Sequence, residues 1–250
     1  MHIKMNDSLV SVNGGETVLS AARRHGVPIP TLCHHEAVEA YGGCRLCVVE
    51  IGKEGRTRLV VSCLYPVEEG LEVRTASPKV LESRRMTLEL LLARCPDTPA
   101  VRALAAQAGI RDTAFHKREN PDACILCGLC VRICQEQGFS ALSLAHRGDR
   151  KAVATPFREP SSDCVGCGAC ARSCPTGAIA MAEGPDWREI WKRRFELVAC
   201  KSCGKGFATR EQAERLGKDK GFTPIDFETC DDCRRKAVAR TLGAIAAWKI

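Results

Sequence analysis

Long apolar stretches are missing from this sequence of 250 residues, and aromatic residues make up only 5% of it. Because no run of 18 consecutive apolar residues occurs, we expect no membrane-spanning helix. The first residues, MHIKMNDSLVSV, lack the apolar core of a secretory signal, and the pair Arg23–Arg24 lacks the hydrophobic stretch of a twin-arginine signal. These absences predict a cytoplasmic protein.

The motifs of several common enzyme classes are also absent. No GxGxxG follows a predicted strand, so a Rossmann-type dinucleotide site is not expected. There is no P-loop, no HExxH and no Ser/His/Asp pattern in a recognisable context. The sequence therefore offers no evident catalytic site of its own.

Cysteine, in contrast, is abundant, with 17 residues. A cytoplasmic environment keeps thiols reduced, so cysteines at this density indicate metal binding and not a disulfide scaffold. All of them except Cys95 fall in or near CxxC-type groups. The remaining composition, with 45% hydrophobic and 27% charged residues, is typical of a folded globular chain.

The hydrophobic pattern predicts an α+β protein. Short strands are expected in residues 9–12, RLCVVEIG, TRLVVSCLYPV and LEVRT. One helix is expected in GGETVLSAARRHGVPIP, closed by Gly26 and Pro28. These elements predict a small, mostly antiparallel sheet that carries a helix.

Helices are also expected in the rest of the chain. Residues 78–94 and PAVRALAAQAG form two helices, and Gly109 ends the second. Residues 186–197 form a helix with an apolar face that either packs internally or docks a partner, made by Trp187, Ile190, Trp191, Arg194 and Phe195. Near the end of the chain, Thr209 caps another helix, with Gln212 at the capping-box position, and a closing helix runs to Ile250.

An internal repeat gives the strongest functional signal. CILCGLCVRICQEQG and CVGCGACARSCPTGAI align without gaps and share the spacing C-x₂-C-x₂-C-x₃-C. Three close cysteines can bind three irons of a [4Fe–4S] cluster, whereas the fourth, on the following helix, is better placed for the other cluster. The predicted ligand sets are therefore Cys124, Cys127, Cys130 with Cys174, and Cys164, Cys167, Cys170 with Cys134. Zinc binding is the alternative. This module resembles a bacterial two-[4Fe–4S] ferredoxin.

Two CxxC pairs near the end of the chain are separated by 26 residues. This spacing is typical of a tetrahedral zinc site, which would be structural and redox-inert. Its expected ligands are Cys200, Cys203, Cys230 and Cys233. A further iron–sulfur cluster is the competing interpretation.

The first four cysteines have the spacing x₁₀, x₂, x₁₅, which differs from that of a plant-type [2Fe–2S] ferredoxin. Three segments resemble the N-terminal domain of the large iron–sulfur subunit of respiratory complex I: ETVLSAARRHGVPIPTLCHH, GGCRLCVVEI and VVSCLYPV. Many [FeFe]-hydrogenases and the diaphorase subunits of NAD-reducing hydrogenases begin with the same domain. The resemblance implies a β-grasp domain with a [2Fe–2S] cluster on Cys33, Cys44, Cys47 and Cys63. Zinc binding or disulfides are the alternatives.

The resemblance ends after ESRRMTLELLLARCPDTPA. Relatives carry a His–Cys₃ [4Fe–4S] site here, but Cys95–Pro96 stands near the place of the histidine and no further cysteine follows before Cys124. We expect that this cluster is missing and that Cys95 is a buried or unused thiol. His34 and His35 are expected to face solvent or to form hydrogen bonds, and not to bind metal, because four cysteines are already present.

Four segments are thus predicted: a β-grasp [2Fe–2S] domain (1–76), a helical linker (77–115), a two-[4Fe–4S] ferredoxin domain (116–184), and a helix followed by a zinc-ribbon-like Cys₄ domain (185–250). The formal charge of +7 is largely cancelled once sixteen thiolates and their metals are counted. We therefore expect no nucleic-acid partner.

The resemblance implies an iron–sulfur electron-transfer subunit of a cytoplasmic oxidoreductase complex. Its expected partners are a flavin subunit that reacts with NAD(P)(H) and a catalytic subunit such as a hydrogenase, a formate dehydrogenase or another reductase. Ferredoxin would be a further partner if the complex bifurcates electrons. The alternatives are an independent ferredoxin-like carrier and a zinc-binding interaction module without redox function.

Overall fold

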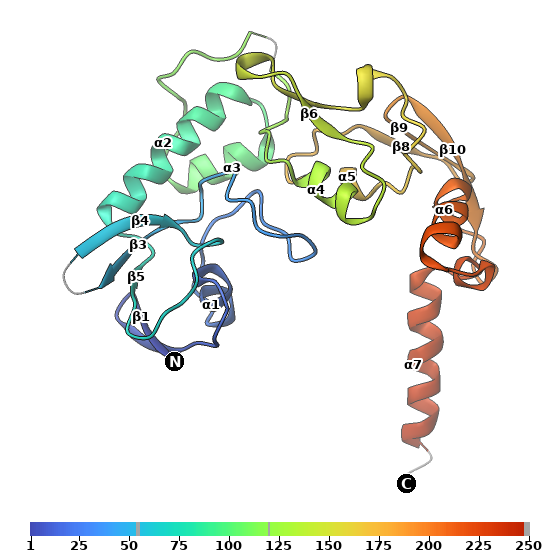
Figure 1. Cartoon of the computed structure of the whole chain (residues 1–250), viewed down its shortest axis with the longest axis horizontal. Coiled ribbons are helices and arrows are strands. Elements are labelled where there is room, and N and C mark those ends of the chain that lie inside the picture. The colour runs from blue at the N-terminus through green and yellow to red at the C-terminus, as the bar shows by residue number, and fades with distance from the viewer. Residues whose placement is uncertain (54–55, 120, 248–250) are drawn as a thin grey trace. The chain divides into compact units, whose positions relative to one another are not determined.

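The computed structural model describes residues 1–53, 56–119 and 121–247 (Figure 1). The chain forms two compact units. The first unit consists of Met1–Ile133, Leu144–Val153 and Ser173–Ala178; the second consists of Cys134–Ser143, Ala154–Arg172 and the chain from Ile179 onward. In the described part of the chain, no helix is both long and apolar enough to cross a membrane.

A five-stranded sheet in the order β2-β1-β5-β3-β4 forms the N-terminal part of the first unit. β1 and β5 are parallel and the other neighbours are antiparallel. The strands are β1 (His2–Met5), β2 (Ser8–Ser11), β3 (Val48–Lys53), β4 (Arg56–Val61) and β5 (Glu72–Arg74). The predicted small, mostly antiparallel sheet is confirmed, although β1 was not predicted.

Helix α1 (Val18–Arg24) completes this domain, as the sequence predicts. The Thr17 side chain caps it by accepting a hydrogen bond from the backbone N–H of Ser20, at 3.2 Å. Gly26, with φ +70°, lies just beyond its end, in a conformation that glycine adopts at little cost. The core between helix and sheet includes Ile3, Leu19 and Val49, which are fully buried. One helix across a mixed sheet is the β-grasp arrangement.

The two helices predicted to follow are α2 (Pro78–Arg94) and α3 (Pro99–Gln107), which pack against each other. Both begin with proline, whose fixed φ suits the first helical position. Gly109, with φ +72°, lies just after α3, so the predicted stop is confirmed.

Short elements carry the cysteine repeat. They are α4 (Leu129–Glu136), β6 (Ser143–Ala145), the 3₁₀ turns η1 (Gly148–Arg150) and η2 (Pro156–Arg158), β7 (Ala152–Ala154) and α5 (Ala169–Arg172). β6 pairs with β7. The rest of the repeat is loop and turn.

The end of the chain is a four-stranded antiparallel sheet followed by helices. In chain order the elements are β8 (Met181–Glu183), β9 (Trp187–Ile190), β10 (Arg193–Ala199), β11 (Gly206–Thr209), α6 (Arg210–Lys220), η3 (Pro224–Phe227) and α7 (Asp231–Ala247). The Thr209 side chain accepts the backbone N–H of Gln212 at 3.1 Å, so the predicted cap of α6 is confirmed. Residues 248–250, the end of the predicted last helix, lie outside the described residues.

The predicted helix over residues 186–197 is wrong, because this segment is the hairpin of β9 and β10. Trp191 and Lys192 form its two-residue turn, both with positive φ (53° and 60°), as the tight turns that match the twist of a hairpin require. Buried residues alternate along the strands, including Arg188 and Phe195. The side chains fit both a helical and an alternating pattern, and packing decided between them.

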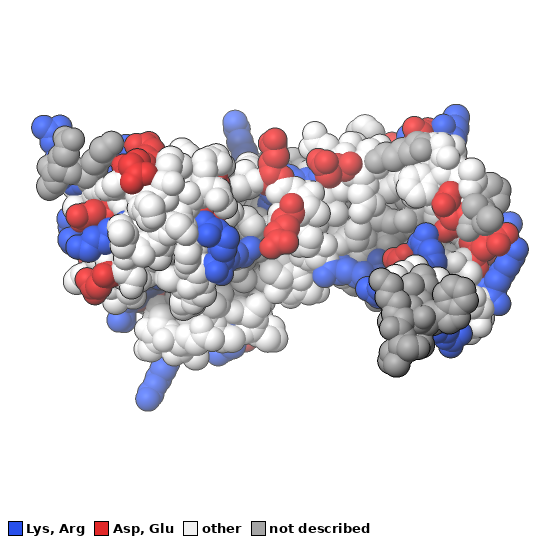
Figure 2. Space-filling model, turned by 90° about the horizontal axis from the view of Figure 1, so that it is seen from below, with Lys and Arg blue, Asp and Glu red and all other residues white. Residues whose placement is uncertain are grey.

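Charged side chains on the face shown in Figure 2 are of both signs. On α7, Arg234 pairs with Asp231 at 2.5 Å and Arg235 pairs with Asp232 at 2.6 Å. These exposed pairs contribute little to stability. They neutralise two of the basic side chains of α7, Arg234 and Arg235.

The core position of Leu19 generates a stability prediction. We expect Leu19→Ala to lower the free energy of unfolding by about 2–5 kcal/mol, because it opens a cavity in the fully buried core. Leu9→Ala is the matched control: Leu9 is 75% exposed, and its truncation should cost less than about 0.5 kcal/mol. Anaerobic urea unfolding measures both. Equal effects of the two substitutions would contradict the described core.

Candidate metal centres

The first four cysteines of the sequence come together beside the N-terminal sheet. All four thiols are buried: Cys33, Cys44, Cys47 and Cys63. The backbone N–H of Cys44 donates to the sulfur of Cys33 at 3.3 Å. A hydrogen bond from Cys33 lowers the pKa of Cys44 to about 5, and one from Cys63 lowers the pKa of Cys47 to about 7. The same bonds, together with burial, raise the pKa values of Cys33 and Cys63.

These thiols therefore form two hydrogen-bonded pairs, Cys33 with Cys44 and Cys47 with Cys63. The negative charges of Cys33 and Cys44 also raise the pKa of Cys63, so the two pairs influence each other. Four buried thiols arranged as two adjacent pairs suit a cluster of two irons, each with two protein sulfurs. The residues present fit the group that the sequence predicts.

Helix α2 holds the loop that carries Cys47. The Arg84 guanidinium donates to the carbonyls of Leu46 and Val48 at 3.0 and 2.7 Å. Burial lowers the pKa of Arg84, and the nearby Cys47 thiolate opposes this shift. The Arg84 cation therefore fixes the carbonyl groups of the residues on either side of Cys47.

The two adjacent histidines form hydrogen bonds, as predicted. His34 Nδ1 lies 3.1 Å from a guanidinium nitrogen of Arg23, and His35 Nδ1 accepts the N–H of Ala37 at 3.1 Å. Burial and the positive charge of Arg23 lower the pKa of His34. These contacts occupy both Nδ1 atoms.

The first set of the repeat, Cys124, Cys127, Cys130 and Cys174, lies within the first unit. Burial raises the pKa values of Cys124 and Cys127, and the negative charge of Cys174 contributes to both shifts. The Cys174 sulfur accepts the backbone N–H of Ala178 at 3.3 Å. A thiol from the second half of the repeat therefore interacts with two thiols of the first half.

Arg132, on α4, links this set to the N-terminal one. Its guanidinium donates to the carbonyls of Glu39 and Cys33 at 2.5 and 2.8 Å and lies 5.6 Å from the ring centre of Tyr41. Its charge also lowers the pKa of Cys127, against burial, which raises it. One cation therefore acts on cysteines of both sets.

The second set of the repeat, Cys134, Cys164, Cys167 and Cys170, lies within the second unit and lines one cavity. Burial raises the pKa of Cys170 to about 11, and negative charge on Cys134 adds to the shift. Gly166, with φ +66°, also lines this cavity, and a Cβ there would lie 2.5 Å from the Phe195 ring. Phe195 thus packs internally behind the cysteine loop, as one of the two interpretations of the aromatic face holds.

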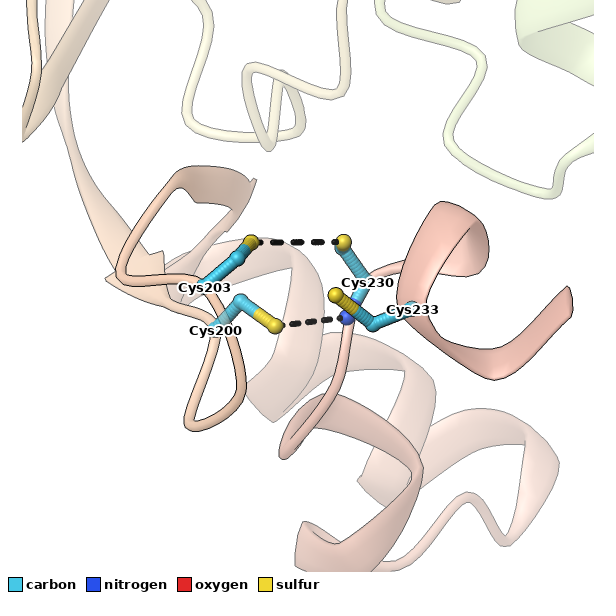
Figure 3. Close-up of side chains that lie close together, drawn as sticks. All are labelled: Cys200, Cys203, Cys230 and Cys233. Atoms are coloured by element: carbon cyan, nitrogen blue, oxygen red, sulfur yellow. Dashed lines mark hydrogen bonds between the residues drawn. The ribbon is translucent and has the colours of Figure 1, made fainter. Parts of the chain in front are cut away.

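The four cysteines of the C-terminal region converge (Figure 3). Cys200 and Cys203 lie in the turn between β10 and β11, Cys230 precedes α7, and Cys233 lies in its first turn. Their sulfurs all lie within 4.8 Å of one another, and those of Cys203 and Cys230 are 3.9 Å apart. Zinc–sulfur bonds of about 2.3 Å in a tetrahedron imply sulfurs about 3.8 Å apart. The spacing fits a single ion better than the separate corners of an iron–sulfur cube.

Hydrogen bonds within this group shift its pKa values in opposite directions. The backbone N–H of Cys230 donates to the Cys200 sulfur at 3.3 Å and lowers the pKa of Cys200 to about 6. Hydrogen bonding to Cys203, Cys230 and Cys200 raises the pKa of Cys233 to about 12. Four thiolates at this distance repel one another, so a bound cation is needed to keep all four deprotonated.

Cys95 belongs to none of these groups and is buried, as predicted. Its neighbour Arg94 donates from Nε to the carbonyl of Cys124 at 2.8 Å. Sequence reasoning missed this arginine, Arg84 and Arg132. Their carbonyl partners lie between 30 and 99 residues away in the chain, and no motif marks such a distance.

Comparisons with known proteins agree with this geometry. Residues 1–78 match the 2Fe-2S iron-sulfur cluster binding domain family, and residues 118–181 match the 4Fe-4S dicluster domain family. These two matches contain the first three cysteine groups. The C-terminal group lies outside both.

Two curated relatives are subunits of nicotinamide-linked enzymes. A subunit of the NADH-quinone oxidoreductase of Rhizobium meliloti (strain 1021) is 30% identical over 230 residues, 82% of this chain and 27% of the relative. A subunit of the NADP-reducing hydrogenase of Solidesulfovibrio fructosivorans, HndD, is 36% identical over 184 residues, 62% of this chain and 31% of the relative. The chain thus spans about a quarter to a third of these relatives.

The match to a solved structure spans most of the length of the matched chain. One chain in the crystal structure of an NAD⁺-reducing [NiFe]-hydrogenase is 30% identical, with a TM-score of 0.61, and the match covers 71% of this chain and 85% of that one. The fold and cysteine groups define an iron–sulfur protein built from ferredoxin-type domains. The chain belongs to the family of iron–sulfur subunits that includes those of NADH-quinone oxidoreductases and NAD(P)-reducing hydrogenases, so the predicted resemblance is confirmed.

The environment of Cys95 generates a reactivity prediction. Burial raises the pKa of this thiol to about 11, and only the thiolate is a good nucleophile. We expect iodoacetamide at pH 8 to leave Cys95 unmodified in the native protein and to modify it after unfolding in urea. Peptide mass spectrometry measures both states. Rapid labelling of Cys95 in the native protein would contradict its buried position.

Proposed function

We propose that this protein passes single electrons between two partner subunits of an oxidoreductase complex. One partner would carry flavin and react with NAD(P)(H), and the other would be a hydrogenase, a formate dehydrogenase or another reductase. The observation that carries the proposal is the presence of three gathered cysteine groups within two iron–sulfur domain matches. The names of the relatives, which include NADH-quinone oxidoreductase and NADP-reducing hydrogenase, support nicotinamide-linked partners.

The proposed ligands are those predicted from the sequence. Cys33, Cys44, Cys47 and Cys63 would hold the [2Fe–2S] cluster. Each [4Fe–4S] cluster would take three cysteines from one half of the repeat and one from the other half. This exchange is supported by the influence of Cys174 on the pKa values of Cys124 and Cys127, and by the place of Cys134 in the cavity of the second set.

Bound iron–sulfur clusters supply one-electron donors and acceptors. The chain's own contribution is to hold the ligand groups at fixed positions and to place charge beside them. Arg132 ties α4 to the loop of Cys33, and Arg84 ties α2 to the loop of Cys47. Because NAD(P)H gives up two electrons together, the partner flavin would divide them before they reach this chain.

For Cys200, Cys203, Cys230 and Cys233 we propose one Zn²⁺ with a structural role. The support is the spacing of the sulfurs, which suits one tetrahedral ion. We also propose a cytoplasmic location, since this many free thiols near one another need a reducing compartment.

The exchange of ligands between the halves of the repeat can be tested by double substitution. Cys134→Ala and Cys174→Ala are each expected to remove one [4Fe–4S] cluster, about four of roughly ten irons. Cys134→Ala with Cys164→Ala should lose no more iron than either single variant, because both ligands serve one cluster. Cys134→Ala with Cys124→Ala should lose both clusters, because these two ligands serve different clusters only if the halves exchange a cysteine. Iron analysis and EPR of the anaerobic protein measure this.

Cys95→Ala is the control for these variants and should keep all the iron, because Cys95 belongs to no ligand set. Loss of both clusters on combining Cys134→Ala with Cys164→Ala, and of only one on combining Cys134→Ala with Cys124→Ala, would contradict the exchange. Each half would then hold its own cluster.

The relay itself can be tested in the native complex. We expect NADH or NADPH to reduce the [2Fe–2S] and [4Fe–4S] clusters, and so to produce their EPR signals, when co-purified partner subunits are present, and to produce no such signals in the isolated chain. Dithionite is the control, since it should reduce both preparations. Elution of the native protein alone near 27.2 kDa, with exchange of electrons among several enzymes, would support an independent carrier instead.

A further inference from the structure

The loop of the second [4Fe–4S] ligand set is held from outside by an unbroken series of side chains. Each carbonyl from Cys164 to Cys167 accepts a side-chain hydrogen bond. The donors are Arg193 to Cys164 (2.8 Å), Thr209 to Val165, Arg188 to Gly166 (2.8 Å) and Arg172 to Cys167 (2.7 Å). Arg188, Arg193 and Thr209 belong to β9, β10 and β11. The C-terminal sheet therefore supplies three of the four contacts.

The three donors from the C-terminal sheet are well supported. Arg188 is only 2% exposed and pairs with Glu183 at 2.6 Å, and Thr209 is fully buried. Arg193 pairs with Glu211 at 3.7 Å and lies 4.7 Å from the ring centre of Phe195. Burying a cation is costly unless it is paired and hydrogen-bonded. These partners indicate that the contacts are a fixed part of the unit.

Holding the carbonyls also orients the peptide N–H groups. In a trans peptide, the carbonyl and the following N–H point in opposite directions. Carbonyls drawn toward the C-terminal sheet therefore turn the next N–H groups away from it, and the Gly166 N–H donates to the Cys164 sulfur. Such N–H groups near cluster sulfurs are among the features that set reduction potential.

The same sheet leads directly to the C-terminal cysteine group. Cys200 and Cys203 form the turn that joins β10 to β11, and Thr209 stands opposite Leu197 in that hairpin. Thr209 also caps α6, which lies between the two CxxC pairs. A metal ion on the four sulfurs would close the hairpin onto the start of α7, and would thereby fix both ends of the segment that contains Thr209.

We propose that the C-terminal Cys₄ module is a clamp for the second [4Fe–4S] site: its metal holds the β10–β11 hairpin so that Thr209 and Arg193 fix the loop Cys164–Cys167. This inference rests on the proposed iron–sulfur function and adds a role to the metal. The metal takes part in no electron transfer. It acts on the stability and the reduction potential of one cluster through hydrogen bonds.

Thr209→Val tests the clamp, because it removes the hydroxyl and keeps a branched side chain of similar size. We expect this variant to release the irons of one [4Fe–4S] cluster to an iron chelator roughly two- to tenfold faster, the factor that one lost hydrogen bond implies. The midpoint potential of that cluster should also change in EPR-monitored titration. Thr209→Ser should restore both properties to wild-type values.

Thr17→Val and Thr17→Ser are the matched controls, since Thr17 also caps a helix by accepting a backbone N–H but does so in the N-terminal domain. They should leave both [4Fe–4S] clusters unchanged. Cys203→Ala, or removal of zinc from the wild-type protein with a zinc-selective chelator, should reproduce the effect of Thr209→Val. Adding Thr209→Val to Cys203→Ala should then have little further effect.

The outcomes separate the two hypotheses. A wild-type protein without [4Fe–4S] signals would overturn the proposed function and this inference together. Intact signals, with release rates and potentials that neither Thr209→Val nor zinc removal alters, would overturn the clamp alone. If Thr209→Val fails to fold, zinc removal from the wild-type protein decides the question by the same two measurements.

Discussion

The structure depends on bringing the thiols of several cysteines close together in each group. Burial raises the pKa values of several of these thiols, and neighbouring thiolates raise them further, so an ion-free group resists deprotonation. Bound metal cations reverse this balance, because the free energy of binding offsets the repulsion and becomes free energy of folding. This explains why the cysteine repeat contains so little regular structure. The loops present sulfur, and protein side chains hold part of their backbone, as at Cys164–Cys167.

Arginine side chains lie beside the first three cysteine groups. Arg84, Arg94, Arg132 and Arg193 each donate to the carbonyl of a proposed ligand or of its direct neighbour. Each guanidinium can bond several acceptors in one plane, which fixes the peptide groups of an irregular loop. The same groups bring positive charge close to thiolates. Loop geometry and electrostatics are therefore set by the same side chains.

The sequence predicts those features that depend on local chemistry. Proline at the start of α2, glycine beyond α3 and Thr209 before α6 are signals that act within a few residues, and all three are confirmed. The hairpin of β9 and β10 was missed because its turn, Trp191–Lys192, lacks the glycine or asparagine that usually marks positive φ. Strand β1 was missed because its four residues, HIKM, give too short a pattern. The arginine contacts connect distant residues, which no local pattern reveals.

Cys203 differs from the other sixteen cysteines in being exposed to solvent. An oxidant that diffuses to the protein therefore meets this sulfur first, before it reaches any thiol that would carry iron. Oxidation in air would then begin at the C-terminal cysteine group, at the one sulfur of that group that faces solvent. Chemical modification of Cys203 would thus be an early sign of ageing in a preparation whose other cysteines are still intact.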